Sequence, residues 1–132
     1  MEAHILGDLN DQPRCELPAE YFLGRDCWVD ARAPDCLQIS GRANFGWCVR
    51  LVTQSHDPRP GKFGTVYGRL LRVDAEAFVA AHCVLYNCHI GEGAVVAVGS
   101  VVSGQTVQPW TMVAGNPARV IMTLVDGDWR PT

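Results

Sequence analysis

The sequence has 132 residues, which is the usual length of one domain. Hydrophobic residues make up 48% of it and charged residues 19%, a composition that supports a packed core and argues against a disordered chain. The formal net charge of −3 comes from 11 basic and 14 acidic residues, so the chain cannot form a broad basic surface and nucleic acid is not an expected partner.

The sequence also argues against a membrane or an export pathway. It contains no apolar run long enough to span a bilayer, and acidic residues interrupt its first twenty positions. We therefore expect a cytoplasmic protein with no membrane partner. The six cysteines form no C-x-x-C pair, so we interpret them as reduced packing residues and expect no metal.

In chain order, residues 1–20 are polar and show no repeat, and we expect them to form an N-terminal arm. Residues 21–107 then show apolar residues at every sixth position, and a small residue follows each of them four places later except Leu85, which is followed by His89. The large apolar positions are Leu23, Val29, Ile39, Phe45, Leu51, Val73, Val79, Leu85, Ile90, Val96 and Val102.

A period of six matches neither an α-helix nor an alternating strand. It is typical of a parallel β-helix, in which six residues make one short strand and one turn. Because three strands complete a coil, the repeat predicts an all-β solenoid of about four coils with the large apolar residues inside. Gly24, Gly46 and Gly91 follow such residues at the turns, where a positive φ or a close backbone approach favours glycine.

The repeat is interrupted at residues 35–38, at residues 56–72 and between Leu85 and Ile90, where it is one residue short, and it ends after Val107. Residues 56–72 are rich in proline and glycine, which predicts a protruding loop. Gln108-Pro109-Trp110 follows Val107, and we expect the solenoid to end there because proline cannot donate to a strand ladder. Residues 108–132 are then a short C-terminal cap, and residues 1–132 form a single domain.

Three segments of the chain resemble a known family. They are Thr53-Gln54-Ser55-His56-Asp57, the Ile-Gly-Glu-Gly-Ala-Val-Val run at 90–96, and the Gly-Asn-Pro-Ala-Arg segment within 109–121. With the repeat, they resemble the hexapeptide-repeat acyltransferases, in particular the sugar O-acetyltransferases of the maltose, galactoside and colanic-acid type. The resemblance implies a left-handed β-helix, a homotrimer with active sites between subunits, and acetyl transfer from acetyl-coenzyme A to a hydroxyl of a small, sugar-like acceptor.

His56 is the candidate general base. It ends a repeat and opens the loop, so we expect it to be exposed at a rigid edge. An imidazole can take the proton of a hydroxyl near neutral pH, and the resemblance gives this position that role. Asp57 is a candidate to orient His56 or the acceptor; the alternative is an exposed loop acid that begins a turn before Pro58.

The resemblance also assigns contacts with coenzyme A to Ala75, Val98 and Ser103 along the coils and to Arg119 after them. The guanidinium of Arg119 suits phosphate oxygens, although the residue could instead bind C-terminal carbonyls. Trp110 is expected either against the cofactor or acceptor or packed at the end of the barrel.

The chain departs from the family pattern near these positions. Residues 97–100 read Ala-Val-Gly-Ser where the family commonly has Gly-Ala-Gly-Ser, so the side chain of Val98 narrows the groove. Residues 103–105 read Ser-Gly-Gln in place of a Thr-Lys-Asp turn, which removes a basic residue near the expected phosphates. Asp74 stands where glycine is common.

Two other functions remain open. One is a non-catalytic hexapeptide scaffold, with which the altered groove residues are consistent. The other is a zinc enzyme like the γ-class carbonic anhydrases, with His56, His82 and His89 as ligands. That family pairs its last two ligands five residues apart, whereas His82 and His89 are seven apart, which disfavours the zinc enzyme.

Overall fold

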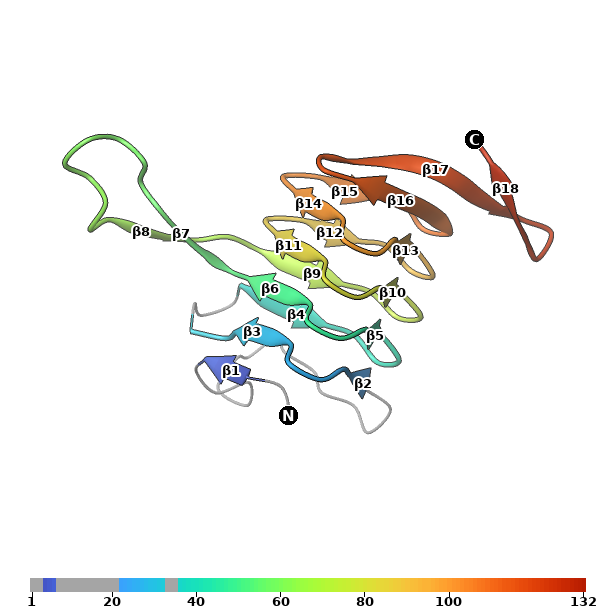
Figure 1. The fold of residues 1–132 in the computed structure, drawn as a ribbon, viewed down its shortest axis with the longest axis horizontal. Coiled ribbons are helices and arrows are strands. Elements are labelled where there is room, and N and C mark those ends of the chain that lie inside the picture. The colour runs from blue at the N-terminus through green and yellow to red at the C-terminus, as the bar shows by residue number, and fades with distance from the viewer. Residues whose placement is uncertain (1–3, 7–21, 33–35) are drawn as a thin grey trace.

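The structure is a computed structural model that describes residues 4–6, 22–32 and 36–132. All regular secondary structure in these ranges is β-strand, and none of them contains a helix that could cross a membrane. Short parallel strands stack into three sheets that form the faces of a solenoid (Figure 1). The predicted all-β parallel β-helix is therefore confirmed.

The three sheets are named A, B and C here. Sheet A contains β1 (His4–Leu6), β3 (Trp28–Asp30), β6 (Arg50–Val52), β11 (Val84–Tyr86) and β14 (Val101–Ser103). Sheet B contains β2 (Phe22–Leu23), β5 (Asn44–Phe45), β10 (Phe78–Val79), β13 (Val95–Val96), β16 (Thr111–Gly115), β17 (Ala118–Val125) and β18 (Asp128–Pro131). Sheet C contains β4 (Leu37–Ile39), β9 (Leu71–Val73), β12 (His89–Ile90) and β15 (Thr106–Val107).

The chain visits sheets B, A and C in that order in each coil. The coils are β2–β3–β4, β5–β6–β9, β10–β11–β12 and β13–β14–β15, as the repeat predicts. Backbone amides of one coil donate to carbonyls of the next; the amide of Asn44 lies 2.9 Å from the carbonyl of Ala77, and that of Phe78 lies 2.9 Å from Ala94. Each coil therefore satisfies the backbone of its neighbour.

The core lies inside the solenoid and consists of the large apolar residues of the repeat. Leu23, at the N-terminal end, is partly buried against this core. Each fully buried side chain of this size contributes about 1.5–3 kcal/mol to folding. The other ten predicted inward positions are at most 1% exposed: Val29, Ile39, Phe45, Leu51, Val73, Val79, Leu85, Ile90, Val96 and Val102.

Close approach, rather than a positive φ, explains the glycines at the corners. A Cβ at Gly46 would lie 2.8 Å from the amide nitrogen of Ala81, and one at Gly91 would lie 2.7 Å from the nitrogen of Pro109. Both glycines therefore permit neighbouring coils to stack. The left-handed conformation at these corners is adopted two residues later, by Cys48 with φ 61° and by Gly93 with φ 65°.

The expected protruding loop is a β-hairpin. β7 (Gln54–His56) pairs in the antiparallel sense with β8 (Val66–Gly68), and the hairpin projects from the corner between sheets A and C (Figure 1). It begins at Gln54, two residues before the expected start of the loop, and the solenoid resumes at Leu71 rather than after residue 72. The first and last residues of the excursion are set by strand pairing, which cannot be predicted from the proline and glycine content.

The solenoid continues past Val107, where we expected it to end. Residues 108–110 form a corner like the others, and β16 then pairs in parallel with β13. Pro109 is tolerated because it occupies the corner rather than a ladder position. β17 and β18 fold back as antiparallel strands and build the cap. The expected arm at residues 1–20 lies outside the described residues, except for β1, which pairs with β3.

Candidate functional site

His56 ends β7 and its side chain is exposed, as expected for a residue at the edge of the solenoid. Its Nδ1 lies 2.7 Å from the backbone carbonyl oxygen of Phe63. A carbonyl oxygen can only accept a hydrogen bond, so Nδ1 carries the hydrogen. The neutral ring therefore keeps its lone pair at Nε2, which is the nitrogen that can accept a proton from a bound molecule.

The path of the hairpin creates this contact. His56 pairs with Val66 across the two strands, and the amide of Asp57 donates to the carbonyl of Thr65 at 2.9 Å. The amide of Thr65 donates in turn to the carbonyl of Lys62 at 2.9 Å. These bonds fold the connecting loop back onto the end of β7, which places the carbonyl of Phe63 beside the imidazole.

Asp57 is buried, which contradicts the alternative of an exposed loop acid. Its side chain is bound to Arg59, whose Nε donates at 2.9 Å and whose backbone amide donates at 3.0 Å, and to the hydroxyl of Tyr67 at 3.3 Å. The hydrogen bonds from Arg59 lower the pKa of this carboxyl below its usual range. The structure thus places Asp57 on the hairpin's own side chains rather than on the His56 ring.

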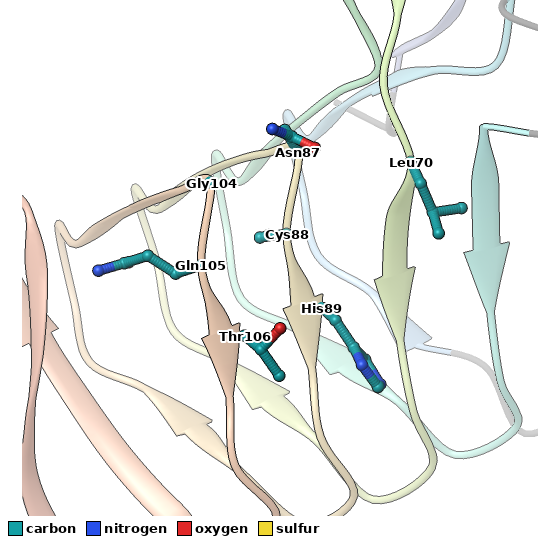
Figure 2. Close-up of a pocket in the computed structure, with 7 residues that line it drawn as sticks. All are labelled: Leu70, Asn87, Cys88, His89, Gly104, Gln105 and Thr106. Atoms are coloured by element: carbon teal, nitrogen blue, oxygen red, sulfur yellow. The ribbon is translucent and has the colours of Figure 1, made fainter.

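One hollow lies beside the root of this hairpin, and a second lies toward the C-terminal end of the solenoid. The first, of about 270 Å³, is lined by Leu70, Asn87, Cys88, His89, Gly104, Gln105 and Thr106 (Figure 2). The second, of about 220 Å³, is lined by Gln105, Thr106, Val107, Gln108, Val113, Ala118, Arg119 and Val120. The two hollows share the lining residues Gln105 and Thr106, and we refer to them together as the corner groove.

An imidazole and a carboxylate meet at the corner groove. Nε2 of His89 lies 2.6 Å from Oδ2 of Asp74, and Nε of Arg72 lies 2.8 Å from Oδ1 of the same carboxylate. Burial raises the pKa of Asp74, but the hydrogen bonds from His89 and Arg72 outweigh it, so the pKa is lowered overall. Asp74 therefore stays ionised near neutral pH and fixes the His89 ring.

The thiol in this groove is not a candidate nucleophile. Cys88 is buried, and burial raises the pKa of its thiol to about 12. Cys27 and Cys83 are also buried, and burial raises their thiol pKa values as well. The described cysteines are free thiols. These three therefore act as small core residues, whereas Cys15 lies outside the described residues.

The residues predicted to bind the cofactor occupy three different corners. Arg119 lines the second hollow, and Ser103 ends β14 next to the first. Ala75 and Trp110 lie at the corners between sheets C and B, and Val98 lies at a corner between sheets B and A, where it is 69% exposed. One chain therefore brings only Ser103 and Arg119 toward the corner groove.

The three histidines considered as zinc ligands are dispersed. His56 is on the hairpin, His82 is exposed at a corner between sheets B and A, and His89 is bonded to Asp74 beside sheet C. Within the part of the chain that the structure describes, no three His, Cys, Asp or Glu side chains gather where they could hold a metal ion.

The sequence analysis did not name Asn87 or Thr106 as site residues, and it noted Gln105 only as part of the altered turn at residues 103–105. It did register Asp74 and His89 as departures, the first from the family pattern and the second from the small residue of the repeat. The contact between Asp74 and His89 could have been predicted from their separation of about one coil, because it places them beside neighbouring strands, β9 and β12, of sheet C.

Solved structures show what this fold is similar to. The chain matches a hexapeptide-repeat acetyltransferase from Vibrio cholerae, solved with acetyl-coenzyme A, with 22% identity and a TM-score of 0.61, covering 94% of this chain and 70% of that one. It matches a maltose O-acetyltransferase from Clostridium difficile with 19% identity and a TM-score of 0.62, over 95% and 68%.

A third match is AntD, an N-acyltransferase from Bacillus cereus solved with a dTDP-amino sugar and coenzyme A. It has 16% identity and a TM-score of 0.68, over 92% of this chain and 77% of that one. No protein-family model and no curated protein matches the sequence. The fold is therefore the left-handed β-helix of hexapeptide-repeat acetyltransferases, as the resemblance implies.

Proposed function

We propose that the chain is an acyltransferase that moves an acetyl group from acetyl-coenzyme A to a hydroxyl of a small, sugar-like acceptor, with His56 as the general base. The observation that carries this proposal is the 2.7 Å contact between Nδ1 of His56 and the carbonyl of Phe63. It leaves Nε2 as a proton acceptor at the exposed end of a rigid strand.

His56 performs the proton transfers of this reaction. Acetyl-coenzyme A supplies the acetyl group as a thioester. Nε2 takes the proton of the acceptor hydroxyl as that oxygen attacks, and it later returns the proton to the departing sulfur. The carbonyl of Phe63 stabilises the positively charged ring that forms between these steps, because it accepts the hydrogen of Nδ1.

Asp57 supports His56 as a positioning residue. Its ion pair with Arg59 holds the loop from which the carbonyl of Phe63 projects, and Tyr67 adds a hydrogen bond from β8. The carboxylate is nearly enclosed, whereas the Arg59 side chain is 71% exposed. The loop therefore keeps the tautomer and the direction of the His56 ring fixed before any substrate binds.

The corner groove fits a long, thin acyl donor. Its first hollow is lined by Leu70, two residues after β8, and its second by Arg119, which is exposed. A pantetheine arm lying in it would have its sulfur near the hairpin and its phosphates near Arg119, whose fork suits phosphate oxygens. The small side chains of Gly104 and Thr106 leave the middle of the groove open.

We also infer that the site is completed between subunits of a homotrimer. Ala75 and Val98 lie on corners other than that of the hairpin, and neither they nor Trp110 line the corner groove of their own chain. Packing three solenoids around an axis brings different corners of neighbouring copies together. Sedimentation equilibrium at several protein concentrations measures this, and a monomer at every concentration contradicts it.

Thiol release from acetyl-coenzyme A, measured with a panel of sugar acceptors, tests the function. We expect acceptor-dependent release that His56→Ala lowers about 10²- to 10⁴-fold in kcat. His4→Ala, which changes a histidine stacked on Trp28 in the first sheet, is the control and should retain activity. Unchanged turnover in His56→Ala would exclude the mechanism, and absence of coenzyme A binding at millimolar ligand would favour the scaffold alternative.

A further inference from the structure

His89 lines the corner groove with a partly exposed imidazole. The residue lines the first hollow and its side chain is 35% exposed, next to Thr106 on the neighbouring strand (Figure 2). Its Nε2 is bound to the carboxylate of Asp74 at 2.6 Å, and a carboxylate can only accept. In the neutral ring, the lone pair is therefore on Nδ1, which has no partner among the described residues.

We propose that Nδ1 of His89 accepts a hydrogen bond from an amide N–H of the pantetheine arm of the acyl donor. The inference rests on the proposed function, because it takes coenzyme A as the occupant of the corner groove. Leu70 and His89 line the same hollow and Arg119 lines the second, so an arm that occupies both hollows lies beside His89. An arm with amide groups offers donors there, as the lone pair requires.

The surroundings of His89 favour a neutral donor over an anion at this point of the groove. On the preceding strand of sheet C, Arg72 is already paired with Asp74, and on the following strand Thr106 carries no charge. Asp74 adds a negative charge behind the ring. A phosphate would meet that charge, whereas an uncharged amide would not.

A pair of variants separates this function from a structural role in sheet C. In His89→Gln the amide nitrogen reaches the place of Nε2, so the bond to Asp74 is retained and the acceptor at the place of Nδ1 is lost. In His89→Asn the amide oxygen falls at the place of Nδ1, so the acceptor is retained and the bond to Asp74 is lost. A structural role predicts that the asparagine variant is the impaired one.

Isothermal titration with coenzyme A is the measurement. We expect His89→Gln to raise Kd about 3- to 10-fold, which is the usual effect of losing one neutral hydrogen bond. His89→Asn should stay within about twofold of wild type. A coenzyme A analogue in which an amide N–H is replaced by an ester oxygen should bind wild type more weakly by the same factor, and the glutamine variant should no longer distinguish the two ligands.

The outcomes separate this inference from the proposed function. If wild type binds coenzyme A and His89→Gln binds it equally well, the role of His89 is wrong and the acyltransferase proposal stands. The same holds if only the KM for the acceptor rises. If wild type does not bind coenzyme A, both fall. Should His89→Gln fail to fold, His89→Ala replaces it and must likewise lose the distinction between amide and ester, and a wild-type protein that binds both ligands equally overturns the inference without a variant.

Discussion

Replacing Gly93 with alanine should destabilise the protein more than the same change at Gly99, although both glycines occupy left-handed corners, with φ of +65° and +71°. An L side chain in this region loses about 1–2 kcal/mol, and alanine regains about 0.4–1 kcal/mol because it restricts the unfolded chain. The backbone contribution alone therefore lowers the free energy of unfolding by about 1 kcal/mol at either position.

Trp110 makes the difference between the two sites. A Cβ at Gly93 would overlap the six-membered ring of Trp110, whereas nothing lies within 4 Å of a Cβ at Gly99. Trp110 is 42% exposed, so more than half of its side chain is covered and can be lost to solvent. If the ring moves away and exposes about 60–80 Å² more, the loss is about 1.5–2 kcal/mol. We expect a total of about 2–3 kcal/mol for Gly93→Ala.

Urea unfolding followed by circular dichroism measures both values, since a change of midpoint at constant slope reports stability alone. A double variant sharpens the test. In a Trp110→Ala background the ring is absent, so Gly93→Ala should cost only about 1 kcal/mol, as at Gly99. Equal losses for Gly93→Ala and Gly99→Ala in the wild-type background would refute the reasoning, because they would show that the ring does not rest on Gly93.

Two further predictions concern charged groups. Asp57→Asn should lower kcat about 10- to 100-fold with little change in Tm, because it loosens the hairpin that lies outside the solenoid. The control is Glu76→Gln, which breaks an exposed ion pair on another corner and should change neither kcat nor Tm. Asp74 has a lowered pKa, so its pairing with His89 contributes stability near neutral pH and loses it as the pH falls through the carboxyl range. The difference in free energy of unfolding between wild type and Asp74→Asn should therefore shrink as the pH falls below about pH 4.

The interior of the solenoid could be predicted because the repeat reports it directly. A period of six can bury one large side chain per strand only if the strands wind into coils, and residues such as Phe45 and Leu85 are accordingly buried in the core. The conformation of the corners was harder to predict from the sequence. A glycine in the sequence indicates either a close approach of neighbouring backbone or a positive φ. At Gly46 and Gly91 the structure shows close approach of the next coil.

The contacts of the candidate base could not be predicted in the same way. His56 was identified from its neighbours in sequence, but its partner is a backbone carbonyl seven residues later, in a loop whose path depends on strand pairing and on the Asp57–Arg59 ion pair. A backbone carbonyl carries no residue signature. The burial of Asp57 depends in addition on Tyr67, which comes from the other strand of the hairpin.

The positions that depart from the repeat are those that form the candidate site. The insertion between sheets A and C carries His56, and the shortened repeat between Leu85 and Ile90 produces the bend at Asn87, with φ 48°, at the rim of the corner groove. A regular repeat presents small, uncharged side chains and saturated backbone on every face, which supports packing but offers no proton acceptor. His89 stands where the sequence repeat predicts a small residue, but in the structure it occupies the outward strand position that Arg72 and Thr106 hold in the neighbouring coils, and it takes its orientation from Asp74, one coil earlier. For a solenoid of this kind, pairs of irregular residues one coil apart are accordingly where binding groups should be sought.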